Sequence, residues 1–274
     1  MEVRQSAQPH RSVAVATCTD VGRKRPKNED KFLVLSVDEQ KEFDGLTSKT
    51  FNLGPLGLLL AIADGMGGHR SGEVASAMCT AALRRELLGR ATEGKSAADD
   101  PQSLLVEAVE TANNAIYAAA SKKPECRGMG TTLTVAWLRD GCVELAQVGD
   151  SRAYVFRDGE LLHLTEDQTV GNLLDIERAA FQLSTQVRDM LTQAVGAQPT
   201  VQVALSRTSL QPGDLLMLCC DGLYKVVDEA EVKEILALPV SVQAKAESLV
   251  ARANDHGGPD NITVVLAEAL AETS

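Results

Sequence analysis

The 274-residue sequence predicts an α+β fold, a four-layer α-β-β-α sandwich in which helix pairs flank two mostly antiparallel sheets. Two observations predict it. Short apolar β segments come in blocks, and two of the turns between them are Asp-Gly dipeptides, which are typical of hairpins. Two consecutive amphipathic segments then separate the strand blocks, which breaks the regular strand–helix alternation of a doubly wound parallel sheet.

The first block contains three expected strands, at residues 13–18, 31–37 and 56–63. The charged loop 19–30 joins the first two. Residues 38–54 are polar and show no regular period, so we expect them to form a surface excursion between strands.

From Ser71 the apolar period changes from that of a strand to that of a helix. The expected apolar stripe consists of Val74, Ala75, Met78, Ala82, Leu83 and Leu87. Residues 89–100 are small, polar and acidic and predict a linker. Pro101 then opens a second helix, because the first helical position tolerates proline.

The second block predicts four strands that form one antiparallel meander, at residues 131–138, 143–148, 153–156 and 160–164. Residues 165–190 lose the β pattern and predict a partly helical insertion, the flap. The remaining elements are expected to be strands at 201–205, 214–220 and 261–268 and helices near 228–237 and 241–254.

Length and charge limit the class of protein. The whole chain, 1–274, fits a single domain with its core at about 13–268. A formal net charge of −11 argues against nucleic acid as a general partner. No apolar segment reaches the length that spans a bilayer, and residues 1–12 lack the apolar stretch of a secretory signal, so we expect no membrane association and a cytoplasmic location.

The six cysteines are expected to be reduced thiols. Cys219 and Cys220 are adjacent in an expected strand, so they point to opposite faces and are poorly placed to bond each other. The spacings match no zinc-binding pattern.

Four carboxylates stand at the ends of apolar strands: Asp64 and Asp221 in Asp-Gly pairs, Asp150 after Gly149, and Asp260 before the last strand. One Asp-Gly pair indicates a turn. Four carboxylates delivered by rigid strands indicate a site for hard cations, which take oxygen ligands rather than thiols.

Six motifs follow one another along the chain: Gly22-x-x-Arg25-x-x-Asn28-Glu29-Asp30, Asp64-Gly65-Met66-Gly67-Gly68, Gly130-Thr131-Thr132, Gly149-Asp150-Ser151-Arg152, Asp221-Gly222 and Gly258-Pro259-Asp260-Asn261. In this order they resemble the PPM family of metal-dependent protein phosphatases (the PP2C type), and Met66 resembles the residue found in its bacterial branch. The resemblance implies hydrolysis of phosphoserine and phosphothreonine by a hydroxide that bridges two divalent metals, Mn²⁺ or Mg²⁺.

The resemblance also implies a metal shell. Asp64 would bridge both ions and the Gly65 carbonyl would bind one of them, while Asp221 and Asp260 would hold the other. Asp150 matches the position that holds a third, weaker ion shared with Asp221. The acidic pair Glu29 and Asp30 would support this shell.

Two basic side chains have different expected roles. We expect Arg25 to bind the phosphate, because a planar guanidinium matches two phosphoryl oxygens. His69 could assist proton transfer or could simply pack locally. The general acid is not assigned, since Met66 stands where some relatives have a histidine. Gln168 likewise replaces a histidine of many relatives.

The leading hypothesis is a bacterial, cytoplasmic and monomeric Ser/Thr protein phosphatase that reverses a protein kinase. Its substrates would be the phosphoproteins of a cognate Ser/Thr kinase, or the kinase itself. Two alternatives stay open. The chain could be a catalytically impaired relative that binds phosphoproteins as a regulator, or it could act on a small-molecule phosphoester.

Overall fold

A computed structural model describes residues 12–43, 48–67, 71–92, 100–122, 126–139, 141–176 and 184–271, and two antiparallel sheets dominate it. The six-stranded sheet has the order β10 (Glu160–His163), β9 (Arg152–Arg157), β12 (Leu215–Cys219), β13 (Ile262–Ala269), β1 (Ser12–Asp20) and β4 (Lys49–Asn52). The seven-stranded sheet has the order β11 (Ala204–Ser209), β8 (Cys142–Val148), β7 (Leu133–Arg139), β5 (Leu58–Met66), β2 (Asp30–Ser36) and β3 (Lys41–Glu42), and β6 (Gly130–Thr131) pairs with the end of β5.

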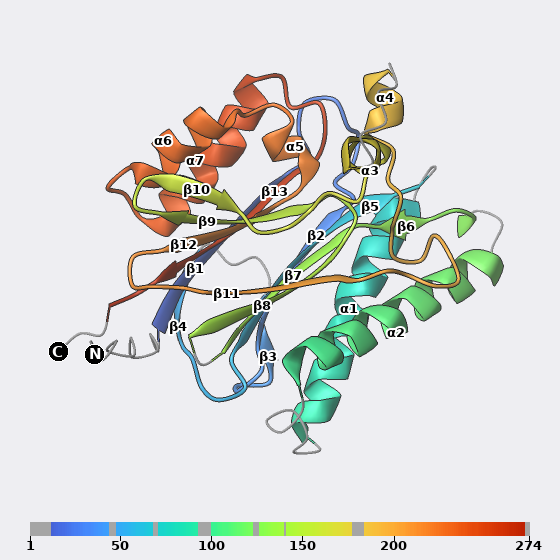
Figure 1. The fold of residues 1–274 in the computed structure, drawn as a ribbon, viewed down its shortest axis with the longest axis horizontal. Helices are drawn as coiled ribbons and strands as arrows, with labels where there is room; N and C mark the ends of the chain where they lie inside the picture. Colours follow the sequence, from blue (N-terminus) through green and yellow to red (C-terminus); the bar gives the residue numbers. More distant parts are fainter. Residues whose placement is uncertain are drawn as a thin grey trace.

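Helix pairs cover the outer faces of the two sheets, which confirms the predicted four layers (Figure 1). Helices α1 (Ser71–Thr92) and α2 (Pro101–Lys122) pack on the seven-stranded sheet. Helices α6 (Glu229–Ala237) and α7 (Val242–Asp255) lie over the six-stranded sheet. Three short helices, α3 (Val170–Ile176), α4 (Thr185–Arg188) and α5 (Asp221–Tyr224), lie at one end of the sandwich.

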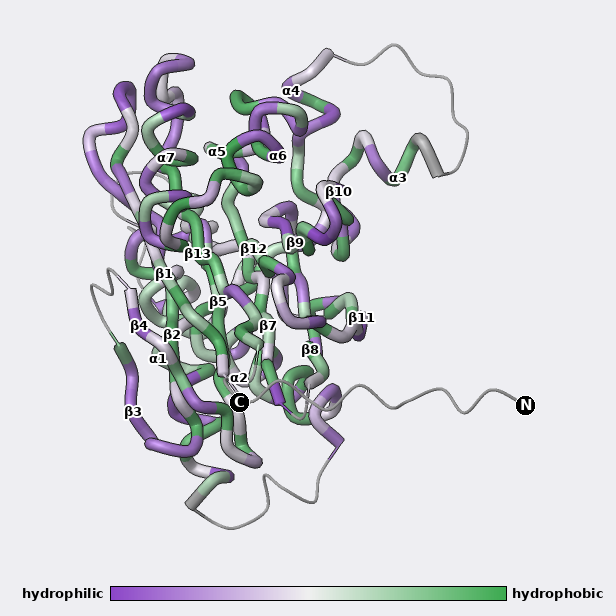
Figure 2. The backbone as a smooth tube through the Cα atoms, turned by 90° about the vertical axis from the view of Figure 1, so that its left-hand side faces the viewer, coloured by the Kyte–Doolittle hydropathy of each residue, from purple (hydrophilic) through white to green (hydrophobic). Residues whose placement is uncertain are grey.

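The core forms three apolar layers, one between the sheets and one under each helix pair. The sequence of β5 is an uninterrupted apolar run because both faces of this strand are buried. Leu59 and Ala61 face α1 and α2, whereas Leu60 and Ile62 face the other sheet. Each buried leucine or isoleucine contributes about 1.5–3 kcal/mol. Figure 2 shows this hydrophobic interior along the central strands, with hydrophilic backbone at the periphery, as at β3.

Local signals explain the boundaries of the C-terminal helices. Asp228 and Glu231 form a reciprocal capping box at the start of α6, and the Ser241 side chain caps α7. The buried Lys245 ammonium donates to the Leu236 carbonyl, 2.7 Å away, near the C-terminus of α6. These contacts fix the helix pair over β1 and β13.

The predicted four-stranded meander is wrong. Strands β7 and β8 form one hairpin in the seven-stranded sheet, and β9 and β10 form another in the six-stranded sheet. The chain crosses between sheets at Gly149-Asp150-Ser151, where Gly149 has φ +98°, a conformation that favours glycine. The turn dipeptides predicted both hairpins but carried no information about the crossing.

Smaller predictions also need correction. Residues 38–54 are not a plain excursion, because β3 and β4 add edge strands to both sheets. The strand expected at 201–205 lies at 204–209. Val74 is exposed rather than part of the buried stripe of α1, and this helix continues to Thr92, into the expected linker.

In the described ranges, no helix has both the length and the hydropathy that crossing a bilayer requires.

Candidate active site

A polar cavity of about 230 Å³ is lined in part by the first residue of the short helix α5 and by the C-cap residues of α4 and α5. Its lining includes most of the residues that the sequence singled out. These are Arg25, Glu29, Asp64, Gly65, Met66, Asp150, Asp221 and Asp260. Segments far apart in the sequence therefore meet here, drawn from both sheets and from the loops between them.

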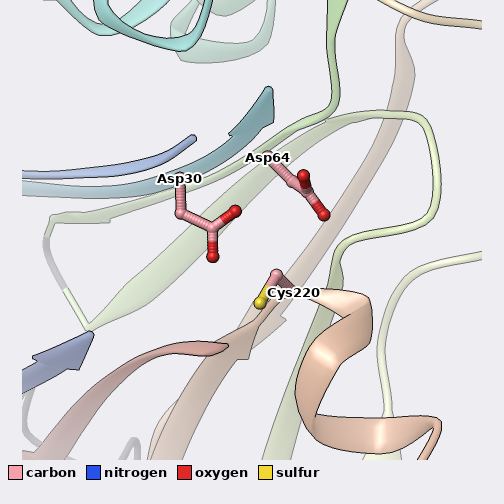
Figure 3. A group of neighbouring side chains, drawn as sticks. All are labelled: Asp30, Asp64 and Cys220. Carbon is pink, nitrogen blue, oxygen red and sulfur yellow. The ribbon is translucent and has the colours of Figure 1, made fainter. Parts of the chain in front are cut away.

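The seven-stranded sheet contributes two carboxylates that face each other directly. Asp30 begins β2 and is paired with Asp64 in β5 by the antiparallel register. Strand β5 does not stop at Asp64, as the sequence suggested, but continues to Met66. Like charges directly opposite across two strands are destabilising, and a bound cation or a proton relieves the repulsion. Figure 3 shows both side chains, with Cys220, gathered where the two sheets meet.

The six-stranded sheet contributes the next carboxylate through a sharp chain turn. Strand β12 ends at Cys219, and Asp221 is the first residue of the one-turn helix α5. Gly222 allows this helix to approach β13, because a Cβ at this position would lie 1.9 Å from the Asn261 carbonyl oxygen. A larger residue would push Asp221 away from the cavity.

The Asn261 side chain forms hydrogen bonds that hold the loop 21–29, which carries Arg25 and Glu29. Its Oδ1 accepts from the Glu29 backbone N–H at 2.8 Å, and its Nδ2 donates to the Val21 and Lys27 carbonyls. The same residue follows Asp260, whose Oδ1 accepts from the Asn261 backbone N–H. One buried amide thus fixes the loop 21–29 against the turn before β13.

Arg25 extends from that loop over the cavity. Its Nη2 donates to Asp260 Oδ2 at 2.6 Å, and about half of its side chain is exposed. This contact uses one of the five guanidinium N–H donors, so the others are available to an anion that enters the cavity.

The lining of the cavity also includes a lysine that the sequence analysis did not identify. Lys225 Nζ lies 2.7 Å from Asp221 Oδ2 and 3.8 Å from Asp150 Oδ2. The Tyr224 hydroxyl donates to Asp150 Oδ2 at 3.2 Å. Burial lowers the pKa of Lys225, but Asp221 and Asp150 more than offset this effect, so the lysine is a cation here.

The concentration of carboxylates perturbs their titration. Burial, with a smaller contribution from the neighbouring acids, raises the pKa of Asp64 well above its usual value. Burial likewise raises the pKa of Asp30 to about 6, although the Thr263 hydroxyl donates to it at 2.6 Å. The pKa of Asp150 is also raised to about 6, by burial and then by Asp221. Such clusters favour the binding of positive charge.

The donor set fits small hard cations. Asp30 Oδ1 and Asp221 Oδ1 are buried and have no hydrogen-bond partner among the described residues. A buried carboxylate oxygen without a donor is costly unless a cation pairs with it. Asp30, Asp64 and Cys220 can also place one ligand atom each within 4.8 Å of one another.

Cys220 does not suit a ligand role in this set. Its sulfur accepts from the Thr263 backbone N–H at 3.1 Å and contacts the Asn261 carbonyl at 3.3 Å. Burial and then the nearby Asp30 and Asp64 raise its pKa well above that of a free thiol. The six cysteines are all free, and Cys219 and Cys220 pack on opposite faces of the sheet, as predicted.

Other residues that the sequence analysis weighed have mainly structural contacts. Thr131 Oγ1 donates to the Asp64 carbonyl at 2.8 Å. Arg152 forms a bidentate pair with Asp167. Gln168 accepts from the Gly149 N–H at 2.8 Å and so holds the crossing beside Asp150. His69 lies outside the described residues, and its role stays a prediction.

Four residues of the site were missed or given no role: Tyr224, Lys225, Asp189 and Asn261. One signal was available for Lys225, because it follows Asp221 by four residues and this spacing brings two side chains together on a helix. Asp189 lies in the flap, where the sequence shows no pattern that directs a side chain toward the cavity.

Comparisons with known proteins show which family and which proteins this chain is similar to. The sequence profile described as Protein phosphatase 2C matches residues 44–262. The chain is 33% identical over 253 residues to the serine/threonine phosphatase stp of Listeria innocua, and the match covers 91% of this chain and 93% of that protein. It is 38% identical over 215 residues to the serine/threonine protein phosphatase PstP of Mycobacterium tuberculosis, which covers 77% of this chain and 40% of PstP.

Solved structures are similar over almost the whole chain. The catalytic domain of PstP, crystallised with two manganese ions, superimposes with a TM-score of 0.75 at 33% identity and covers 95% of this chain and 100% of that domain. A serine/threonine phosphatase of S. agalactiae gives a TM-score of 0.76 at 28% identity, covering 94% and 99% of the two chains.

Proposed function

The chain belongs to the protein phosphatase 2C family and is a phosphoprotein phosphatase; we propose that it removes phosphate from phosphoserine and phosphothreonine with the help of two divalent ions. One observation supports the two-ion proposal most strongly. Asp30 and Asp64 face each other across two paired strands, and buried oxygens of Asp30 and Asp221 have no hydrogen-bond donor. Two bound cations would balance the negative charge that the protein gathers here.

The proposed ligands are those named from the sequence. Asp64 would contact both ions and the Gly65 carbonyl would contact one, with Asp221 and Asp260 around the other and Glu29 and Asp30 as outer support. When bound, Mn²⁺ or Mg²⁺ would lower the pKa of a water molecule and neutralise charge on the phosphoryl group. The manganese ions of the related PstP structure support this choice of metal.

Arg25 is the proposed phosphate ligand. Its guanidinium reaches over the carboxylates from the rim and is held at 2.6 Å by Asp260, which fixes its direction and leaves further donors free. A phosphoryl group placed between Arg25 and the carboxylate-bound ions would be contacted by positive charge from two sides. Asn261 keeps the Arg25 loop in place by its contacts to residues 21, 27 and 29.

The proposal also covers the oligomeric state, the location and the substrates of the protein. The chain would act as one domain and as a monomer, in the cytoplasm, on the substrates of a Ser/Thr kinase or on the kinase itself. Its six free cysteines are typical of a reducing compartment.

A metal-depletion experiment tests the proposed function. Exhaustive EDTA treatment should abolish hydrolysis of an aryl phosphate, and Mn²⁺ should restore it, because oxygen ligands release these ions reversibly. Full activity after metal removal would contradict the two-ion mechanism.

A substrate panel separates the remaining alternatives. Phosphoserine and phosphothreonine peptides, sugar phosphates and nucleotides are assayed side by side with Mn²⁺. The proposal expects clear preference for the peptides. Preference for a small phosphoester would identify a different hydrolase, and peptide binding without hydrolysis would identify a regulatory relative.

A further inference from the structure

Lys225 lies where three carboxylates converge. Its ammonium is 2.7 Å from Asp221, 3.8 Å from Asp150 and 4.0 Å from Asp189 of the flap. All four residues line the candidate active site. Asp150 is almost fully buried, so its charge is poorly solvated and depends on a nearby partner.

The local fold fixes this lysine in place. Helix α5 consists of a single turn, and the Lys225 backbone N–H closes it by donating to the Asp221 carbonyl at 3.1 Å. The turn sets Lys225 directly over Asp221, four residues earlier. The neighbouring Tyr224 donates a hydrogen bond from its hydroxyl to Asp150. The Arg152 guanidinium in turn stacks on the Tyr224 ring, 3.6 Å from its centroid.

We propose that Lys225 is a built-in cation that takes the place of the third metal ion between Asp150 and Asp221, so that this phosphatase binds two ions and not three. The inference rests on the proposed two-ion function. It changes one sequence-based expectation, the third and weaker ion shared by these two carboxylates.

Space and charge both support the replacement. A divalent ion binds carboxylate oxygens at about 2.0–2.6 Å. An ion shared by Asp150 and Asp221 would therefore lie close to the Lys225 nitrogen, which already contacts Asp221 at hydrogen-bond distance. With Lys225 2.7 Å from Asp221 Oδ2, an ion on that oxygen would lie within about 5 Å of the ammonium. Two positive centres this close repel strongly in a partly buried site. The lysine is covalently attached, so it also has an entropic advantage over a free ion.

The lysine also links the site to the flap. Asp189 follows helix α4, and its carboxylate is the third acid around the ammonium. A fixed cation would give this flap segment a constant partner, whereas a weakly held ion would do so only at high metal concentration.

Counting bound Mn²⁺ tests the inference without relying on activity. We would titrate the purified full chain with Mn²⁺ and measure free ion by electron paramagnetic resonance, for the wild type, Lys225→Met and Lys225→Arg. The expected counts are two ions for the wild type and for Lys225→Arg, which keeps the charge. Lys225→Met should bind a third ion at least tenfold more weakly than the first two. Lys225→Gln serves as a second neutral variant if the methionine variant misfolds.

Further variants and outcomes make the test decisive. The double variant Lys225→Met/Asp150→Asn should lose the third ion, which locates it at Asp150. Three ions in the wild type would overturn this inference and leave the two-ion function intact. No bound Mn²⁺ in the wild type would overturn the proposed function itself. An unchanged count of two in both neutral variants, with a raised KM for aryl phosphate, would instead show that Lys225 binds substrate and would overturn the inference.

Discussion

Two groups of carboxylates in the candidate active site, which we call the Asp30–Asp64 end and the Lys225 end, balance their negative charge differently. At one end Asp30 and Asp64 face each other across β2 and β5, and neither forms an ion pair within the described ranges. At the other end Asp150, Asp221 and Asp189 surround the Lys225 ammonium. The number of carboxylates alone therefore does not give the number of metal ions: the protein supplies a cation of its own beside Asp150 and Asp221, whereas Asp30 and Asp64 have none among the described residues, and the proposed function assigns added ions to them.

Neutralising the Asp30–Asp64 end should have the largest effect. Asp64→Asn, and likewise Asp221→Asn at the join between the two ends, should lower kcat/KM by more than about 100-fold. Outer-sphere changes at metal sites already cost roughly 10–100-fold, and these residues are proposed direct ligands. Steady-state hydrolysis of an aryl phosphate with saturating Mn²⁺ measures the effect, and circular dichroism controls for folding. Near-normal activity in Asp64→Asn would remove the distinction between the two ends.

Removing Arg25 should have an intermediate effect, mainly on binding. Arg25→Ala should raise KM by about tenfold or more, because a hydrogen bond to a charged group is worth about 1.5–3 kcal/mol and the phosphate contact already exists in the ground state. Arg25→Lys, which keeps the charge but not the planar fork, should recover only part of the loss. If kcat falls while KM stays constant, Arg25 acts on the transition state and the proposed role is wrong.

The smallest effects come from a matched pair that deletes one hydroxyl at each end. Thr263→Val removes the 2.6 Å hydrogen bond to Asp30, and Tyr224→Phe removes the 3.2 Å hydrogen bond to Asp150. Metal-free Thr263→Val should lose about 1–3 kcal/mol of unfolding free energy, because it leaves a buried carboxylate short of a donor. Tyr224→Phe should lose only about 1 kcal/mol or less, since Lys225 remains beside Asp150. Urea unfolding in EDTA measures both, and the reverse order of losses would contradict the comparison.

Features that depend on residues close together along the chain could be predicted from the amino-acid sequence. Apolar runs and turn dipeptides predicted the long strands and two hairpins, but not β3 and β4, and the sequence pattern also predicted α1, α2, α6 and α7. The ordered motifs identified Arg25, Asp64, Asp150, Asp221 and Asp260, and the structure brings them all to one cavity. These signals are local or are short motifs, so a one-dimensional pattern can carry them.

The pairing of segments that lie far apart in the sequence became visible in the folded chain alone. The crossing at Gly149-Asp150-Ser151 places two consecutive hairpins in opposite sheets, and strand register places Asp30 opposite Asp64. Long-range folding also brings Lys225 close to three acids: Asp221 of α5, Asp150 of the crossing and Asp189 of the flap. Hairpins depend on short-range turns, whereas sheet partition and the electrostatic neighbours of a side chain depend on contacts between residues far apart in sequence. Those contacts are set by how the apolar faces of both sheets pack together.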